Sequence, residues 1–325
     1  MNRLSFLIGR LVKGVFVILA IGVLAFLVIR LVPGDPVAVI AGKSGAVDAE
    51  YMDNLRQKLG LDQPLVVQLG IFLKGLVQGD LGQSYRQGAP VSAIILERLP
   101  ATLLLTLSAS ALSILLGVLA GAMAARRRGT WADSAIGTLA LLFYATPLFW
   151  MGLMAILLFS LVLGWFPAFG MVSADMRYEG IRHVLDVLHH LIMPMTILGL
   201  FYMAVYARLT RASMLEVSEM DFVRTARAKG LPESYITRRH ILRNALLPII
   251  TFAGIQAGHL IGGTVLIETV FGWPGIGRLA FDSLLQRDYP VLLGVFIITS
   301  SMVVIFNILT DLLYTLVDPR IEVNK

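Results

Sequence analysis

The His and Asp side chains between residues 183 and 190 are the first group in the sequence whose types could hold a metal ion. His183, Asp186 and His190 follow one another at i, i+3 and i+7, which places them on one face of a helix. Imidazole and carboxylate groups bind transition metals. The same spacing also occurs on interfacial helices whose polar face carries imidazoles, and we favour that interpretation. We therefore expect no metal site in this chain.

Two short glycine patterns are similar to nucleotide-binding sequences. The GKS at 42–44 matches the end of a phosphate-binding P-loop, but the first glycine of that motif would fall on Val37. The GIGRLA at 275–280 satisfies the dinucleotide pattern G-x-G-x-x-A, yet it lies between apolar segments and has no βαβ unit around it. We interpret the second pattern as a turn and expect no nucleotide site in this chain.

Two polar residues within an apolar segment and one carboxylate at the end of another are candidates for a transport role. Gln256 and His259 are three positions apart and share nearly one helix face. They are candidates for a translocation pathway, and packing inside a helix bundle is the equal alternative. Asp311 would lie about 21 residues into a helix that begins near Pro290. That depth is close to a membrane interface, so we favour a structural anchor over a transport role.

The composition shows which elements must position these residues. The chain has 325 residues, of which 57% are hydrophobic and 15% are charged, and it contains no Cys. These values exclude an ordinary soluble enzyme, a disordered chain, a disulfide scaffold and thiolate chemistry. Six segments without Asp, Glu, Lys or Arg are long enough to predict membrane helices: 14–29, 99–125, 134–174, 187–207, 244–267 and 289–310.

The distribution of positive charge predicts the orientation of these helices. With one span over 134–174, one side holds 16 of the 27 Lys and Arg residues, eight of them between positions 208 and 243. Two spans around Pro147 would put that basic segment on the opposite side from the other positive charges. The first segment is flanked by basic residues but lacks a small-x-small cleavage site, so we interpret it as an uncleaved helix.

We therefore predict an all-α polytopic membrane protein with six transmembrane helices and both termini in the cytoplasm. The expected parts are an N-terminal transmembrane helix (1–32), an extracytoplasmic region (33–99), a five-helix core (100–317) with a cytoplasmic insert (208–243), and a cytoplasmic tail (318–325). The pI of 9.7 then reflects orientation in the lipid bilayer, and nucleic acid is not an expected partner.

The insert at 208–243 carries signals for a short helix. SEMD at 218–221 fits a capping box with Ser218 as N-cap. Phe222, Val223 and Ala226 are predicted to share a face, Gly230 suits a left-handed stop, and Pro232 can begin the next helix. The result would be a helix of about three turns. A solvated connector is one interpretation of this helix, and a docking helix for a cytoplasmic partner is the other.

Glycines repeat every four residues in two of the predicted spans. Gly254, Gly258 and Gly262 form one smooth stripe in the fifth span, and Gly117 and Gly121 form another in the second. Small residues at this spacing allow two helices to approach closely. We expect these glycines to lie at helix–helix contacts.

Several separated stretches of the chain resemble the permease subunit of bacterial ABC importers. They begin with ARLTRASMLEV (207–217), DFVRTARAKGL (221–231) and RRHILRNALLPIIT (238–251) in and after the insert. Further matches are RLVPGDP (30–36), LGLDQPLVVQ (59–68), GDLGQS (79–84), ETVFGWPGIGR (268–278), RDYPV (287–291) and DPR (318–320). The resemblance is narrowest to the peptide/nickel branch, to the first of its two dipeptide or oligopeptide permease proteins.

This resemblance implies an ABC importer type I-like permease core whose coupling helix enters a groove on an ATPase subunit. The general signature of the family is EAA, three residues, then Gly. Placing that Gly on Gly230 puts Arg-Thr-Ala (224–226) in the EAA position, and Leu247-Pro248 falls later than in the general pattern. Arg224 and Asp221 are the candidate replacements for the Glu. The implied ATPase-coupling residues are Asp221, Phe222, Arg224, Thr225, Ala226, Arg227, Lys229 and Gly230.

The resemblance also implies partners and a division of labour. The chain would form half of a translocation pathway in the bacterial cytoplasmic (inner) membrane, together with a second homologous permease. Two ABC ATPases would bind ATP and Mg, an extracytoplasmic binding protein would deliver the substrate, and this chain would bind no cofactor. Small peptides are the default cargo, with nickel chelates and glutathione as alternatives. A stand-alone ion-coupled secondary transporter is the other class, but the inverted repeats and paired broken helices typical of it are not evident.

Overall fold

The computed structural model describes residues 3–31, 49–58, 60, 62–173 and 178–317, and these residues form helices joined by turns. The helices are α1 (Arg3–Leu31), α3 (Ala49–Lys58), α4 (Leu65–Val77), α5 (Val91–Arg126), α6 (Trp131–Ala145), α7 (Leu148–Ala155), the π-helix η1 (Ile156–Val162), α8 (Ile181–Ser218), α9 (Asp221–Ala228), α10 (Glu233–Tyr235), the π-helix η2 (Ile236–Leu242), α11 (Arg243–Gly263), α12 (Val265–Val270), α13 (Ile276–Leu285) and α14 (Tyr289–Val317). The GKS at 42–44 and the tail at 318–325 lie outside the described residues.

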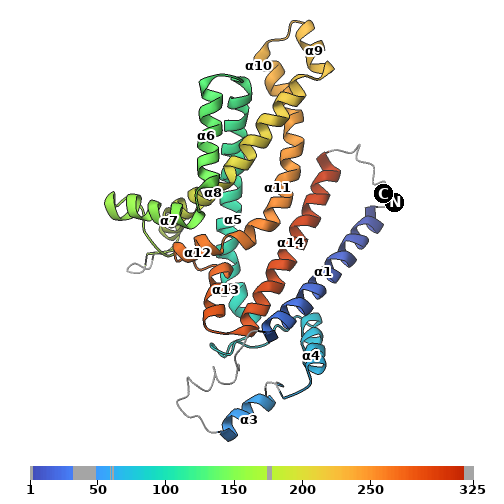
Figure 1. Ribbon diagram of the computed structural model, residues 1–325, viewed down its shortest axis with the longest axis vertical. Helices are drawn as coiled ribbons and strands as arrows, with labels where there is room; N and C mark the ends of the chain where they lie inside the picture. Colours follow the sequence, from blue (N-terminus) through green and yellow to red (C-terminus); the bar gives the residue numbers. More distant parts are fainter. Residues whose placement is uncertain (1–2, 32–48, 59, 61, 174–177, 318–325) are drawn as a thin grey trace.

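Long apolar helices dominate this arrangement, as Figure 1 shows. Four of those described are long and apolar enough to cross a bilayer, over Gly9–Val28, Val91–Arg126, Ile181–Ser218 and Tyr289–Thr310. The α6 and α7–η1 pair would be a fifth if it counts as one broken span. Helix α11 occupies the segment in which the sequence predicts the fifth span. The all-α membrane fold is therefore confirmed, while the count of six spans and the side on which the termini lie stay predictions.

The predicted third span is not one continuous helix. Helix α6 ends at Ala145, and the next helix begins at Leu148 after a bend of 98°. Thr146 has extended backbone angles and Pro147 is the residue before α7. Proline restricts the preceding residue to extended conformations and cannot donate a helical hydrogen bond, so the break falls where the chemistry of the backbone requires it.

Helices α5 and α8 cross at the two glycines of α5. A Cβ at Gly117 would lie 3.0 Å from the carbonyl oxygen of Met203, and a Cβ at Gly121 would lie 2.7 Å from the Cβ of Thr210 and overlap the carbonyl oxygen of Ala207. The α8 backbone therefore rests directly on these glycines. In α11, a Cβ at Gly254 would overlap the side chain of Thr310 on α14.

The buried side chains form three main clusters. One lies between α5, α8 and α12 and contains Leu105, Leu198 and Trp273. A second joins α5 to α13 and α14. A third, around Val223 and Ile236, lies between the end of α8, α9 and η2 at the far end of the molecule. Helix α5 thus contributes to the first two clusters, and the segment after α8 packs around a separate small core.

Candidate functional site

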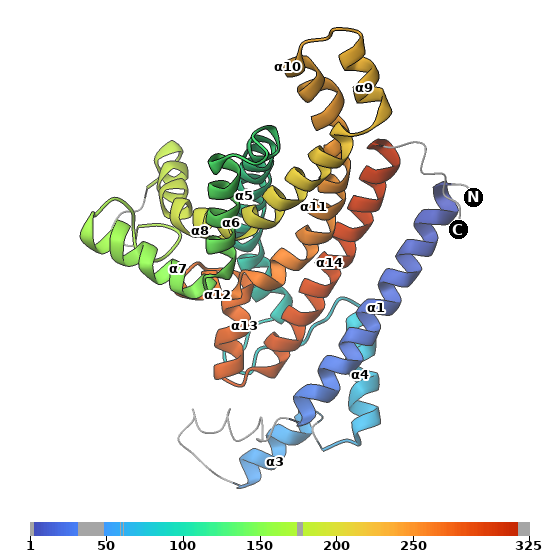
Figure 2. The same cartoon turned by 45° about the horizontal axis from the view of Figure 1, so that its top comes forward.

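Helix α9 lies at one end of the molecule, beyond the ends of α8 and α11 (Figures 1 and 2). Its inner face is fully packed, with Val223 at 0% exposure and Ala226 at 5%. These two side chains contact a cluster made of Met214 and Val217 from α8, Ile236 and Ile241 from η2, and Ala245 from α11. The helix is therefore a fixed part of the structure with one face left toward the outside.

The sequence predicts the C-terminal end of α9 correctly and its N-terminal end incorrectly. Gly230 has φ of +74°, which confirms the predicted left-handed stop. The amide of Leu231 donates to Ala226 O and the amide of Gly230 to Arg227 O, which is the Schellman pattern. The predicted capping box is wrong, because α8 continues through Ser218 and its hydroxyl donates to Leu215 O at 2.7 Å. Met220 is the N-cap and makes no side-chain cap hydrogen bond.

The outer face of α9 is polar and basic with apolar side chains at its margin. Asp221 and Arg224 expose 96% and 71% of their side chains and lie 3.7 Å apart. Phe222 is 42% exposed, so the prediction that it shares the buried face is wrong; it lies about 100° around the helix from Val223. Thr225 and Lys229 are also exposed. The exposed apolar side chains beside this face are Met220, Leu231 and Tyr235.

Arg227 fastens α9 to the helix that follows it. Its Nη2 and Nε donate to the two carboxylate oxygens of Glu233 at 2.8 and 3.2 Å. The guanidinium beside Glu233 lowers the pKa of that carboxyl below its ordinary value. Nη1 of Arg227 also donates to Ser218 O at 3.4 Å. Arg227 therefore connects the end of α8, α9 and the start of α10, and it is held by contacts within the chain.

A second ion pair joins the start of α6 to α8. Nε and Nη2 of Arg211 donate to the Asp133 carboxylate at 2.7 and 2.8 Å, and the amide of Gly129 donates to the same carboxylate at 3.1 Å. Asp133 is buried although it lies next to a turn. The sequence pattern does not single out either residue, because their contact spans 78 positions.

The segment after α11 contains a buried carboxylate that sequence reasoning missed. Glu268 is 0% exposed and accepts hydrogen bonds from Thr102 Oγ1 at 2.7 Å and from the amide of Arg278 at 2.9 Å. The second bond places the carboxylate at the N-terminus of α13, where the helix dipole favours negative charge. A Cβ at Gly275 would overlap this carboxylate, and one at Gly277 would lie 2.9 Å from it. The glycines of the dinucleotide-like pattern thus accommodate the chain's own Glu268. The prediction that this pattern is a turn is wrong, because Gly275 is the N-cap of α13 and the other five residues are helical.

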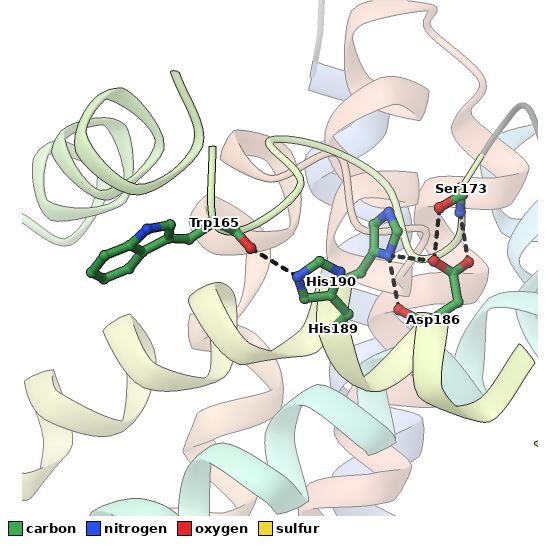
Figure 3. A network of polar contacts seen from close by, with 5 residues as sticks. All are labelled: Trp165, Ser173, Asp186, His189 and His190. Carbon is green, nitrogen blue, oxygen red and sulfur yellow. Dashed lines mark hydrogen bonds and ion pairs between the residues drawn. The ribbon is translucent and has the colours of Figure 1, made fainter. Parts of the chain in front are cut away.

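Figure 3 shows the polar network at the start of α8. The Asp186 carboxylate accepts hydrogen bonds from the Ser173 amide and hydroxyl, both at 2.7 Å, and Nδ1 of His190 donates to Asp186 O at 2.8 Å. His189 contacts Trp165 O through Nε2 at 2.9 Å, while His183 is exposed. These bonds connect the loop after η1 to α8. Among the described residues, no three His, Cys, Asp or Glu side chains gather in a metal-binding group.

The proposed pathway residues lie on α11. Gln256 is partly buried there, and His259 follows one turn later on the same helix. Gly258 and Gly262 also lie on α11. The side-chain surroundings of His259 and Asp311 and the contacts of these two glycines are outside the described part of the chain. The pathway role of Gln256 and His259 therefore stays a prediction.

The long apolar helices, the glycine-mediated α5–α8 crossing and the exposed α9 define a multi-pass helical membrane protein. Family models agree, since residues 113–323 match the binding-protein-dependent transport system inner membrane component and residues 3–106 match its N-terminal region. The chain belongs to this family, as a multi-pass permease component of the ABC peptide importer type.

Individual relatives cover nearly the whole chain. It is 40% identical to the oligopeptide transport system permease protein AppB of Bacillus subtilis (strain 168) over 98% of this chain and 99% of the relative. It is 41% identical to the di/tripeptide transport system permease protein DppB of Pseudomonas aeruginosa (strain UCBPP-PA14), again over 98% and 99%. A chain of the inward-facing MetNI methionine ABC transporter shares the fold with a TM-score of 0.56 and 16% identity, over 70% of this chain and 97% of that one.

Proposed function

We propose that this chain forms half of an ATP-driven import pathway for small peptides in a bacterial inner membrane. Its partners would be a second homologous permease, two ABC ATPase subunits that bind ATP and Mg, and an extracytoplasmic binding protein. The observation that carries the proposal is α9, a helix packed firmly on one face and exposed on the other at the end of two long helices. The chain itself would bind no nucleotide and no metal.

The surface of α9 suits a docking role in a groove of a partner. Helix-in-groove recognition uses a short helix with apolar anchors beside charged residues. Phe222 supplies an exposed aromatic side chain, and Arg224 and Lys229 supply positive charge. Aromatic and Arg side chains contribute most strongly to such interfaces. Asp221 and Arg224 lie in the first turn of α9. This chain lacks the EAA signature, and these two residues would replace the Glu of that signature.

The α9 proposal can be tested with two matched glycine substitutions. Gly230 and Gly129 have φ of +74° and +76°, and neither would bring a new Cβ within 4 Å of another atom. Alanine at either position therefore adds only backbone strain, about 1–2 kcal/mol. We expect Gly230→Ala to lower ATPase co-purification about 5- to 30-fold and Gly129→Ala to leave it unchanged. Equal co-purification with both variants would contradict docking through α9.

A second pair of variants tests the aromatic anchor. Phe222 and Phe281 expose 42% and 40% of their surface, but Phe281 lies on α13 at the opposite end of the molecule (Figure 1). We expect Phe222→Ala to weaken ATPase binding and Phe281→Ala to leave it intact. Cargo is tested separately, by measuring how tightly the partner binding protein binds peptides, nickel chelates and glutathione. Preference for either alternative over peptides would contradict the peptide assignment.

A further inference from the structure

The groove between α1 and α14 combines basic and apolar lining residues. It encloses about 260 Å³, and five residues from each helix line it. The α1 side consists of Arg10, Lys13, Gly14, Val17 and Ile21, and the α14 side of Ser300, Val303, Val304, Asn307 and Ile308. None of the lining residues is acidic. The two cations lie together near the start of α1, and apolar side chains follow one another from there along the helix. This order of charge and apolar surface matches an amphiphilic anion.

The helices cannot close this groove by packing more tightly. A Cβ at Gly14 would already lie 2.6 Å from Val304 Cγ1, so α1 and α14 touch at this glycine. The groove lies beside this contact, where Lys13 and Val17 of α1 face Val304 and Asn307 of α14. The two helices are therefore held at a fixed separation, and a gap remains along one side of their line of contact.

The length of the groove fits one membrane leaflet. Arg10 and Ile21 are eleven residues apart, which is about 16 Å along a helix. Half of a hydrocarbon core of about 30 Å is about 15 Å. The N-terminal end of α1 and the C-terminal end of α14 point toward the end of the molecule that carries α9 (Figures 1 and 2). A head group beside the two cations would then sit at the membrane surface, with its chain reaching to the middle of the bilayer.

We propose that this groove binds an anionic phospholipid, with the phosphate beside Arg10 and Lys13 and an acyl chain along Val17, Ile21 and Val304. Basic residues between membrane helices recognise anionic head groups, and each contributes roughly a five-fold gain in affinity. Asn307 is exposed at the same level and offers a carboxamide to the polar part of the lipid. The lipid would fill the space that Gly14 and Val304 leave beside their contact, and so support α1 against α14. This inference is independent of the cargo and of ATPase docking.

The test uses the purified full-length chain and phosphatidylglycerol that carries a photoreactive diazirine in its acyl chain. We expect cross-links on residues 17–21 and 300–308. Unlabelled phosphatidylglycerol should compete, whereas phosphatidylcholine and inorganic phosphate should not. Competition by inorganic phosphate would indicate a free-anion site, and equal competition by phosphatidylcholine would indicate a groove without charge selectivity. Either result, or the absence of cross-links in these segments, overturns the proposal.

Variants with matched charge provide the second arm. Arg10→Gln with Lys13→Gln should lower labelling between about 5- and 30-fold. Arg126→Gln with Arg127→Gln removes the same charge from exposed positions at the end of α5 and should leave labelling unchanged. Val17→Trp keeps both cations but fills the apolar channel, so it should also reduce labelling. Equal loss in the two charge variants, or full labelling of Val17→Trp, would contradict an anionic lipid in this groove.

Discussion

Removal of the Glu268 carboxylate should destabilise the junction of α5, α12 and α13 more than any nearby surface change. The carboxylate accepts from Thr102 Oγ1 at 2.7 Å and from the Arg278 amide at 2.9 Å, and it is completely buried. In Glu268→Ala these donors lose their acceptor in a site that water does not reach. A hydrogen bond to a charged group contributes about 1.5–3 kcal/mol. Two such losses predict a decrease in the free energy of unfolding of about 3–6 kcal/mol.

The measurement is thermal unfolding of the purified full-length chain in detergent, followed by Trp fluorescence and by size exclusion. Trp273 is a suitable reporter because it is fully buried beside this site and its Nε1 donates to Ala101 O at 2.8 Å. The predicted loss corresponds to a decrease in Tm of about 10 °C. Glu97 on α5 is exposed, so Glu97→Ala removes the same group without a buried partner. Equal Tm values for the two variants would refute the buried-acceptor reasoning.

The pH dependence gives an independent signature of the same site. Glu268 begins the segment between the predicted fifth and sixth spans. Burial raises the pKa of its carboxyl above the ordinary 4.5, and this effect outweighs the hydrogen bonds, which lower the pKa. The folded state therefore holds its proton to higher pH than the unfolded state. Stability from this group is highest below pH 4.5 and falls as pH rises toward the raised folded pKa. Glu268→Gln should abolish this trend; a trend that persists unchanged in Glu268→Gln would exclude Glu268 as its source.

Three further predictions concern the insert and the helix crossing. A single Cys at Ser234, which is exposed, should react with an impermeant reagent only after the membrane is opened; labelling from outside would contradict a cytoplasmic insert. Gly121→Val should lower the free energy of unfolding by about 1–3 kcal/mol, because the new side chain would overpack against α8. Gly137→Val should not, because a Cβ there meets nothing within 4 Å. Equal Tm values for the two variants would contradict a close crossing of α5 and α8. The Arg227–Glu233 bond lowers the pKa of Glu233, so its contribution is present at neutral pH and is lost as pH falls below 4.5. The hydrogen-exchange protection factors of the α9 amides should therefore fall at low pH in the wild type but not in Glu233→Gln.

Features that depend on a few neighbouring residues could be predicted from the sequence. The end of α9 at Gly230 follows from a local rule, since glycine alone adopts positive φ without strain. The small-residue spacing of Gly117 and Gly121 likewise marks a place where a backbone can approach. The predicted N-terminal boundary of α9 was wrong because the Ser218 hydroxyl can donate a hydrogen bond to Leu215 O within α8 as readily as it can cap a new helix.

Features that depend on distant partners could not be predicted. Glu268 and Thr102 are 166 positions apart, and Asp133 and Arg211 are 78 apart. The glycines of GIGRLA show that the start of α13 admits a close neighbour, but they do not identify that neighbour as Glu268. The break at Pro147 shows the opposite case: the cause is local, yet charge sorting treated the stretch as one span and could not detect a bend of 98°.

Helix α8 connects the exposed α9 to the rest of the molecule, and its contacts limit how α9 can move. Val223 of α9 packs in the same cluster as Met214 and Val217 of α8, so the two cannot separate without exposing a core. From Pro194 to Ser218 α8 is about 36 Å long, and a tilt of 5° would displace its end by about 3 Å. At Arg211, 17 residues from Pro194, the same tilt gives a displacement of about 2 Å. This would stretch the 2.7 and 2.8 Å bonds of Arg211 to Asp133 beyond hydrogen-bond distance. Any force on α9 must therefore move α6 and α5 together with α8, or break this ion pair first.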